Sequence, residues 1–339
     1  MRGVKCMVRG AWCLVFGSWC LALAAFADDV KVGIIGIDTS HATAFANLLN
    51  RANKKPEHEG FRVVAAYQWG SRDIKSSIDR YPKFLASMAK NGVEMVDSIP
   101  ALLAKVDVVL LETNDGRLHL EQATEVFKSG KRVYVDKPVA NTLVDTLKMF
   151  AAAKRYNCPF FSSSALRYVK NAQAARAGAF GKVRGAVTYS PSGAEPHHSR
   201  YYWYGMHAFE PLVTIMGRGV KEVTCVKGAG GVEMVTGVWQ DGRVGSAWCG
   251  TPWYGGVIMC ADRKQGDYGM VQMGGYEGYE KLLEEILAFF RTGKVPIDPD
   301  ETIELFAFME AAAQSYERDG AKVDVGDVLA KAKAEVGMR

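Results

Sequence analysis

The chain lacks a strong excess of charge of either sign. Its 339 residues include 42 lysines and arginines against 37 aspartates and glutamates, which gives a formal net charge of +5. Arg2, Lys5 and Arg9 lie in a segment that we expect to be removed, and without these three charges the balance is +2. A chain so close to neutrality, with no cluster of basic residues, is not suited to bind nucleic acid or an anionic membrane surface.

Cysteine is also scarce. Three of the seven cysteines fall in the first 20 residues, and the other four are Cys158, Cys225, Cys249 and Cys260. Four cysteines in so long a chain do not form a disulfide framework. No Cys-x-x-Cys or Cys/His zinc spacing occurs, so the sequence predicts buried thiols and no metal site.

Only one apolar run, from Ala11 to Phe26, is long enough to be considered as a membrane segment. A basic stretch precedes it, and Ala25-Phe26-Ala27 then matches the small-x-small pattern of a cleavage site. This layout predicts a secretory signal peptide over residues 1–27, although a retained anchor is the alternative. The expected mature protein is periplasmic or extracellular, with no stable membrane insertion after cleavage.

The first half of the mature chain alternates short apolar strands with helices. A strand is expected at Val30–Ile37, and good helix N-caps at 38–40 precede an apolar-periodic stretch at Ala42–Leu49. Further strands are expected at 61–67, 106–111, 131–135 and 158–162, and helices at 119–128 and 141–156. This alternation predicts βαβ units and a parallel sheet over residues 28–160.

Beyond residue 160 the pattern changes to longer strands separated by glycine-rich turns, including the hairpin signal Asp241-Gly242. Strands are expected at 182–190, 221–227, 232–239, 243–249 and 257–262, and helices near 204–216, 276–292 and 299–317. The fold class is therefore α/β. A parallel-sheet domain (28–160) precedes an α+β domain (161–339) with an open, mainly antiparallel sheet.

The turn after the first strand lacks most of the glycines of a dinucleotide-binding turn. Gly36-Ile37-Asp38-Thr39-Ser40-His41 keeps only the first glycine of G-x-G-x-x-G, and any strand-to-helix turn could have this sequence. Asp38 would repel a pyrophosphate, so its side chain must cap the helix, bind the ribose or point away. Thr39 and Ser40 can still offer hydroxyl and backbone donors to phosphate.

The end of the second strand usually selects the ribose of the cofactor. Ser71 and Arg72 favour the 2′-phosphate of NADP, whereas the adjacent Asp73 favours the free hydroxyl of NAD. Arg72 is equally compatible with a solvated loop. The expected cofactor is therefore NAD or NADP.

A later segment, Val135-Asp136-Lys137-Pro138, resembles the E-K-P motif of the Gfo/Idh/MocA oxidoreductase family, which includes glucose–fructose oxidoreductase and inositol dehydrogenase. Four other segments are similar to that family in their order and spacing. They are 32–36, 112–119 with Glu112-Thr113-Asn114, 177–183, and 204–210, which resembles a G-x-H-x-x-D helix. The resemblance covers nearly the whole mature chain and implies a Rossmann-type first domain.

The resemblance also implies roles for individual residues. Lys137 would hydrogen-bond or polarise the reacting hydroxyl, and His207 would act as the general base. The second domain would carry the substrate site and the contacts of a homo-oligomer. The expected cofactor-binding residues are Gly36, Ile37, Asp38, Thr39, Ser40, His41, Ser71, Arg72, Thr113, Asn114 and Asp136.

Two features concern the substrate. Tyr201, Trp203 and Tyr204 are candidate contacts, because aromatic rings with polar tips suit a carbohydrate or polyol, although core packing is the alternative. Arg167 is a further candidate, because it resembles an arginine that lies near the site in this family. Trp203 also stands where many family dehydrogenases carry an aspartate four residues before the histidine. The nearby 195–198 loop, with Glu195, His197 and His198, could replace that acid or remain solvated.

The sequence thus favours an exported NAD(P)-dependent oxidoreductase that acts on a sugar, polyol or derivative. One alternative is a glycoside-cleaving or sugar-modifying enzyme that uses tightly bound NAD transiently. The other is a non-catalytic sugar- or nucleotide-binding protein, which Trp203 and the lost glycines favour and which Lys137 and His207 oppose. General secretion exports unfolded chains, so either the cofactor is captured after export or the site binds something else.

Overall fold

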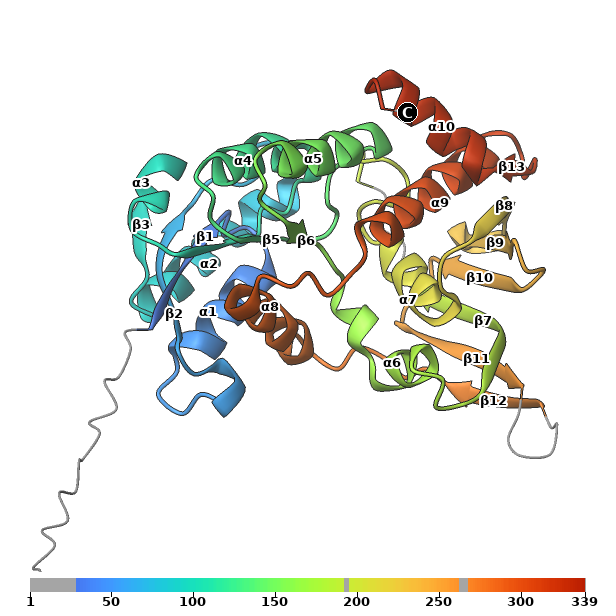
Figure 1. Cartoon of the computed structure of the whole chain (residues 1–339), viewed down its shortest axis with the longest axis horizontal. Helices are drawn as coiled ribbons and strands as arrows, with labels where there is room; N and C mark the ends of the chain where they lie inside the picture. Colours follow the sequence, from blue (N-terminus) through green and yellow to red (C-terminus); the bar gives the residue numbers. More distant parts are fainter. Residues whose placement is uncertain (1–28, 192–194, 262–267, 339) are drawn as a thin grey trace, which may run out of the picture.

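Two β-sheets lie side by side in the protein, each covered by helices (Figure 1). The computed structural model describes residues 29–338 except 192–194 and 262–267, so the expected signal peptide lies outside the described residues. Within the described part of the chain, no helix combines the length and apolar character needed to cross a membrane.

The first sheet has six parallel strands in the order β3-β2-β1-β4-β5-β6. Its apolar central strands are buried on both faces, as helices on both sides of a parallel sheet require. The strand order reverses between β1 and β4, and ligands of such sheets bind at the carboxyl ends of strands beside that point. The strands are β1 Val30–Ile35, β2 Phe61–Tyr67, β3 Glu94–Val96, β4 Val108–Leu111, β5 Val133–Val135 and β6 Phe160–Phe161.

Five helices follow these strands, and side-chain caps fix where several of them begin. The hydroxyls of Thr39 and Thr142 and the carboxylate of Asp115 each accept a hydrogen bond from a backbone amide in the first turn of the next helix. The helices are α1 Ser40–Asn50, α2 Lys75–Lys90, α3 Ile99–Leu103, α4 Gly116–Lys128 and α5 Leu143–Arg155, with a 3₁₀ turn at Pro56–His58.

The second sheet has seven strands in the order β12-β11-β7-β10-β9-β8-β13. It is mixed, because β7 and β10 pair in parallel while all the other neighbours are antiparallel. The strands are β7 Lys182–Ser190, β8 Val220–Lys227, β9 Glu233–Trp239, β10 Val244–Cys249, β11 Gly255–Ala261, β12 Tyr268–Gln272 and β13 Val323–Asp324. The helices around it are α6 Lys170–Arg176, α7 Met206–Met216, α9 Pro299–Glu317 and α10 Val325–Glu335, with 3₁₀ turns at Ala165–Tyr168 and Ala229–Gly231.

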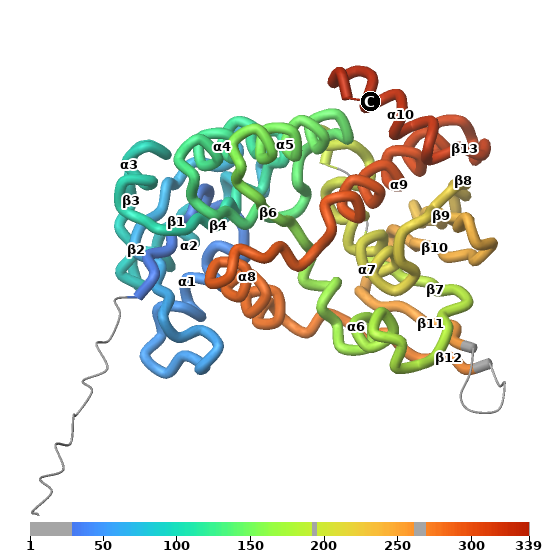
Figure 2. The backbone as a smooth tube through the Cα atoms, in the orientation of Figure 1, coloured from blue at the N-terminus to red at the C-terminus, as the bar shows by residue number. Residues whose placement is uncertain are grey.

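One late helix, α8 (Glu280–Thr292), does not pack on the second sheet that precedes it. Its apolar side, which includes Leu282, Ile286 and Phe289, belongs to the same buried cluster as Val32 of β1 and Phe45 of α1. Figure 2 shows the chain leaving β12, crossing to α8 beside α1, and returning to α9. The first sheet is therefore completed by residues from the last quarter of the chain.

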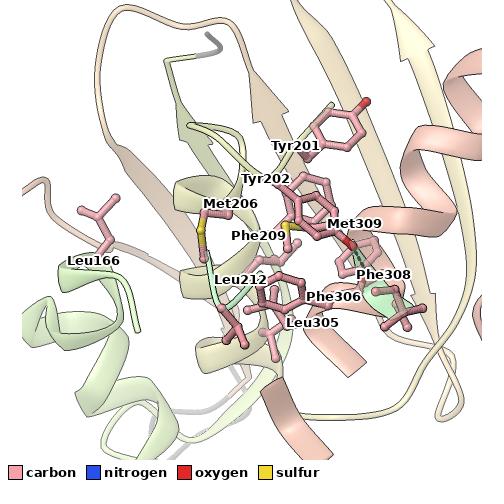
Figure 3. Close-up of a cluster of buried hydrophobic side chains, with 14 of the residues drawn as sticks. Leu166, Tyr201, Tyr202, Met206, Phe209, Leu212, Leu305, Phe306, Phe308 and Met309 are labelled. Atoms are coloured by element: carbon pink, nitrogen blue, oxygen red, sulfur yellow. Dashed lines mark hydrogen bonds between the residues drawn. The ribbon is translucent and has the colours of Figure 1, made fainter. Parts of the chain in front are cut away.

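The aromatic segment before α7 forms part of the core between the two sheets. Figure 3 shows Tyr201 and Tyr202 packed among side chains of α7 and α9, including Phe209, Phe306 and Phe308. Tyr202 is fully buried, and its hydroxyl donates to the carbonyl oxygen of Phe306 at 3.3 Å. These rings stabilise the packing of α7 against α9.

The predicted fold class is confirmed, and several elements end where the sequence indicated, including β2, β7 and α9. Helix α2, strand β3 and helix α10 were not predicted, and α10 rather than α9 closes the chain. Pro82 inside α2 and the short length of β3 hide both elements from a periodicity argument.

Candidate active site

A cavity of about 160 Å³ lies at the carboxyl ends of the first sheet's strands, between the two sheets. Residues from both halves of the chain form its wall. The lining residues are Thr39, Ser40, His41, Arg80, Asn114, Asp136, Lys137, Ser164, Ala165, Leu166, Tyr204, His207, Tyr254, Tyr276 and Tyr279. The cavity therefore brings together Lys137 and His207, the two residues that were expected to be catalytic.

Lys137 stands directly after β5, and its peptide bond to Pro138 is cis. Its ammonium lies 5.6 Å from the centre of the Tyr204 ring. Burial lowers the pKa of Lys137, and the neighbouring carboxylate of Asp136 opposes that shift. The side chain is therefore placed to donate a hydrogen bond into the cavity from a desolvated position.

His207 lies in the first turn of α7 and also lines the cavity. Its Nδ1 is 2.8 Å from the hydroxyl oxygen of Ser164, and its ring meets the Tyr254 ring edge-on with centres 5.6 Å apart. Burial lowers the pKa of His207 well below its usual value, and the charge of Lys137 acts in the same direction. Both effects favour the neutral form of the imidazole.

A buried ion-pair network holds Ser164, the residue that orients the His207 ring. Glu210, one turn further along α7, accepts hydrogen bonds from the Ser163 hydroxyl and the Ser164 backbone amide, each at 2.7 Å. Arg167 pairs with Glu210 at 2.8 Å and with Glu301 of α9 at 2.7 Å. Arg167 is 3% exposed and does not line the cavity, so its expected substrate contact is replaced by this supporting role.

Four tyrosines form an aromatic wall of the cavity. Tyr204 was expected there, and the other three were not. Tyr254 directly precedes β11, and Tyr276 and Tyr279 lie in the segment before α8. The hydroxyl oxygens of Tyr279 and Ser40 are 3.1 Å apart, so this wall is tied to the first turn of α1. The wall presents ring faces and hydroxyl groups to the same space.

Tyr201 and Trp203 do not reach this wall, so their expected substrate contacts are corrected. The Tyr201 hydroxyl lies 3.3 Å from the Cys225 sulfur on β8, and Trp203 packs on the ring of His198 with centres 4.8 Å apart. Both side chains are used in core packing, which was the alternative reading of this aromatic segment.

The 195–198 loop does not supply a second proton-handling group to the cavity. The His198 side chain is buried, and its Nε2 accepts a hydrogen bond from the Gly116 amide at 3.2 Å. His197 pairs instead with Glu195, Nδ1 to Oε1, at 2.6 Å. None of the three residues is among those that line the cavity.

The turn after β1 keeps its one essential glycine. Gly36 has a φ of 80°, and a Cβ added there would lie 2.4 to 2.6 Å from atoms of Thr113. Ile37 is buried, and Thr39 caps α1, so the amino end of that helix faces the cavity together with the guanidinium of Arg80. A helix amino end beside an arginine is suited to a phosphate.

The Asp38 carboxylate, which would repel a pyrophosphate, points away from this phosphate position. Its carboxylate accepts hydrogen bonds from the backbone amides of Ser71 (3.2 Å) and Asn114 (3.1 Å), and the residue is 2% exposed. Burial raises the pKa of Asp38, and the two amides oppose that shift. Asp38 thus ties the β2, β1 and β4 ends together.

A second hollow, of about 730 Å³, lies on the far side of Asp38, between the ends of β2 and β3 and helix α4. Ser71, Arg72 and Asp73 line it, as expected for the residues that face the adenosine ribose. The Arg72 guanidinium lies 4.2 Å from the Trp69 ring centre, and Asp73 pairs with Arg117 at 2.6 Å. The residues of the cavity and of this hollow fit the two ends of a nicotinamide dinucleotide.

The remaining predicted cofactor residues are divided between the cavity wall and the protein core. Asn114 lines the cavity, whereas the Thr113 hydroxyl donates to Gln122 at 2.7 Å and is fully buried. His41 and Asp136 line the cavity but bind each other, with Nδ1 2.8 Å from Oδ1. Glu112, which sequence reasoning did not assign to the site, lies beneath them, and its Oε2 is 3.9 Å from the same histidine nitrogen.

The comparisons with known proteins agree with this geometry. Residues 30–164 match the model of the oxidoreductase family with an NAD-binding Rossmann fold, GFO_IDH_MocA. A search of curated proteins found no match.

Several solved structures share the whole fold. A putative NADPH-dependent oxidoreductase from Desulfitobacterium hafniense has a TM-score of 0.69 at 16% identity, over 89% of this chain and 99% of that one. A putative myo-inositol dehydrogenase from Sinorhizobium meliloti gives 0.68 at 16%, over 87% and 99%. The scyllo-inositol dehydrogenase from Lactobacillus casei, solved with NAD(H) and scyllo-inositol, gives 0.66 at 13%, over 88% and 100%.

The fold and the site define an NAD-binding oxidoreductase of the Rossmann class. The match to the Gfo/Idh/MocA family model covers residues 30–164, the part of the chain that contains the Asp136-Lys137-Pro138 motif.

Proposed function

We propose that this protein is an exported NAD(P)-dependent oxidoreductase that oxidises a hydroxyl group of a sugar, polyol or derivative, or reduces the corresponding carbonyl. One observation carries the proposal: Lys137 and His207 line one cavity, together with residues at the amino end of α1. A nicotinamide bound there would accept or deliver the hydride.

The chain's own residues would handle the proton. Lys137, held in a desolvated position beside Asp136, would donate a hydrogen bond to the reacting oxygen. His207, neutral and oriented by Ser164, would take the hydroxyl proton on its free ring nitrogen. The two groups act on one oxygen because they share one cavity.

The wall of the cavity supports a compact, hydroxylated substrate. Ring faces of Tyr204, Tyr254 and Tyr276 suit the C–H faces of a sugar ring, and their hydroxyls can pair with its oxygens. The Lactobacillus casei structure with bound scyllo-inositol shows a substrate of this kind on the same fold. Export rests on the sequence of residues 1–27, and we also propose a homo-oligomer.

The test begins with the mature chain, from residue 28, purified without added nucleotide. Mass analysis of released small molecules and titration with NAD+ and NADP+ establish cofactor binding, and a panel of sugars and polyols is then assayed for reduction of the added nucleotide. Lys137→Met should lower turnover by on the order of 10²- to 10⁴-fold while nucleotide affinity is kept. The matched control is Lys148→Met, at a half-exposed lysine on α5.

Steady reduction of added NAD+ or NADP+ by one of these substrates supports the proposal. Bound NAD(H) that does not exchange with added nucleotide points instead to a sugar-modifying enzyme that oxidises and reduces its substrate in one cycle. Absence of any nucleotide affinity, or unchanged turnover in Lys137→Met, overturns the proposal.

A further inference from the structure

Three buried ionisable side chains meet at the floor of the cavity, and the proposed proton chemistry uses none of them directly. Glu112 follows β4, Asp136 follows β5, and His41 lies in the first turn of α1. One ligand-type atom from each lies within 4.8 Å of the other two. All three residues are less than 9% exposed. The sequence showed no such site, because 95 residues separate His41 from Asp136 and only the fold brings them together.

Most of the oxygen atoms in this cluster have no partner. Both carboxylate oxygens of Glu112 and the Oδ2 atom of Asp136 are buried without a hydrogen bond. Asp136 Oδ1, in contrast, faces His41 Nδ1 and also accepts from the Lys137 backbone amide, each at 2.8 Å. Buried carboxylates without partners are costly, and they are rare in proteins unless they pair with a charge or coordinate a metal.

We propose that His41, Glu112 and Asp136 bind one divalent transition-metal ion, with zinc the best match to the ligand set. Zinc binds imidazole nitrogen and carboxylate oxygen at about 2.0–2.2 Å, which places two ligands of a tetrahedral ion about 3.4 Å apart. The distances from His41 Nδ1 to Asp136 Oδ1 (2.8 Å) and to Glu112 Oε2 (3.9 Å) bracket that separation. Two carboxylates and a neutral imidazole also balance the charge of a divalent ion.

The competing occupant is a proton shared between the two carboxyl groups. One proton makes one hydrogen bond and engages two oxygens, so it leaves at least one of the three unpartnered oxygens unsatisfied. The proton also leaves the imidazole outside the bond that it makes. A metal ion can engage an oxygen of each carboxylate and the imidazole at the same time, so it joins all three side chains where a proton joins two.

The position of the cluster defines what the ion could do. His41 and Asp136 line the cavity, whereas Glu112 lies beneath it, so the open side of a three-ligand ion faces the cavity. That side would take a water molecule or an oxygen atom of the substrate. Lys137 and the ion would then approach the same space, which adds an electrophile to the proposed oxidoreductase site.

The test uses the full mature chain after dialysis against a chelator, titrated with Zn²⁺ in the presence of a chromophoric competitor and, separately, with Co²⁺ for its visible spectrum. The expected result is one equivalent bound in the wild type. Glu112→Gln and His41→Gln should each weaken binding by at least about a hundredfold. Circular dichroism checks that both variants fold, and metal analysis of the wild type does not depend on either of them.

Two matched controls come from buried polar groups elsewhere in the chain. Glu233→Gln changes a buried carboxylate that also has an unpartnered oxygen, and His58→Gln changes a buried histidine without partners. Both should bind zinc as the wild type does. Equal affinity in Glu112→Gln and the wild type overturns the proposal. A second outcome also overturns the proposal: the wild type binds no ion, and Glu112→Gln unfolds at a higher denaturant concentration than the wild type. That result indicates that the two carboxyl groups share a proton.

The outcome is separable from that of the proposed function. Nucleotide affinity is measured on the same samples, and a protein that binds zinc but no nucleotide would keep the metal site while losing the oxidoreductase proposal.

Discussion

Replacement of Glu210 by glutamine tests whether the buried ion-pair network holds the proposed base in place. The substitution keeps the shape of the side chain and removes its charge. Arg167, which is 3% exposed, then keeps only Glu301 as a charged partner, and Ser163 and Ser164 donate to an amide instead of a carboxylate.

The expected loss is large because the network has almost no access to water. Removal of one partner from a buried ion pair costs about 3–5 kcal/mol of unfolding free energy, since the remaining charge stays buried. Hydrogen bonds from Ser163 and Ser164 to a charged acceptor contribute about 1.5–3 kcal/mol each, and part of that contribution is retained by the glutamine oxygen. We therefore expect a loss at the upper end of the 3–5 kcal/mol range.

The assay is equilibrium unfolding in urea, followed by circular dichroism and tryptophan fluorescence. Glu284→Gln is the matched control, because the same change there removes an exposed pair with Lys281 that is worth less than about 1 kcal/mol. Turnover is measured on the folded fraction, and we expect it to fall in Glu210→Gln because the backbone amide of Ser164, whose hydroxyl contacts the His207 ring, then has a weaker acceptor. A stability loss below 1 kcal/mol, equal to that of the control, would refute the reasoning.

Two further predictions concern buried contacts outside the cavity. Gly70→Ala should destabilise the protein by about 1–3 kcal/mol, because a Cβ there would lie 2.1 to 2.3 Å from the Asp38 carboxylate, whereas Gly269→Ala meets no atom within 4 Å and should be near neutral in urea unfolding. Burial lowers the pKa of His198 to about 4, below the usual value of a histidine near 6.5, so the unfolded chain binds this proton first as the pH falls. The unfolding free energy should therefore decrease between pH 6.5 and pH 4, by at most about 1.4 kcal/mol per pH unit from this group. In His198→Asn the unfolding free energy should depend less on pH over this range. The same pH profile in the variant and the wild type would contradict this assignment.

The sequence predicted the scaffold well where the local pattern determines the structure. Strand β7 was predicted with its observed ends because its apolar residues alternate. Helix α9 was predicted with its observed ends, and its start is marked by the Asp298 cap and by Pro299 in its first turn. Lys137 and His207 were found through short motifs in which each residue has a fixed place after a strand or in a helix.

The rest of the site could not be predicted, because it depends on contacts between distant segments. Tyr276 and Tyr279 reach the cavity only because the chain crosses back towards the first sheet before α8, and no local pattern shows that crossing. Arg167 and Tyr201 have the chemistry of substrate contacts, but ion pairs in one case and core packing in the other use their side chains elsewhere. Burial and partners decide such cases, and neither can be inferred from one residue's neighbours in sequence.

The return of α8 to the first sheet determines where this protein can be divided. A fragment that ends near residue 160 would contain all six strands of that sheet yet leave bare the apolar surface that Leu282, Ile286 and Phe289 normally cover. Such a truncated product is expected to self-associate rather than remain monomeric, because large exposed apolar patches drive aggregation. A soluble nucleotide-binding fragment would have to carry residues 280–292 as well, joined by an engineered linker.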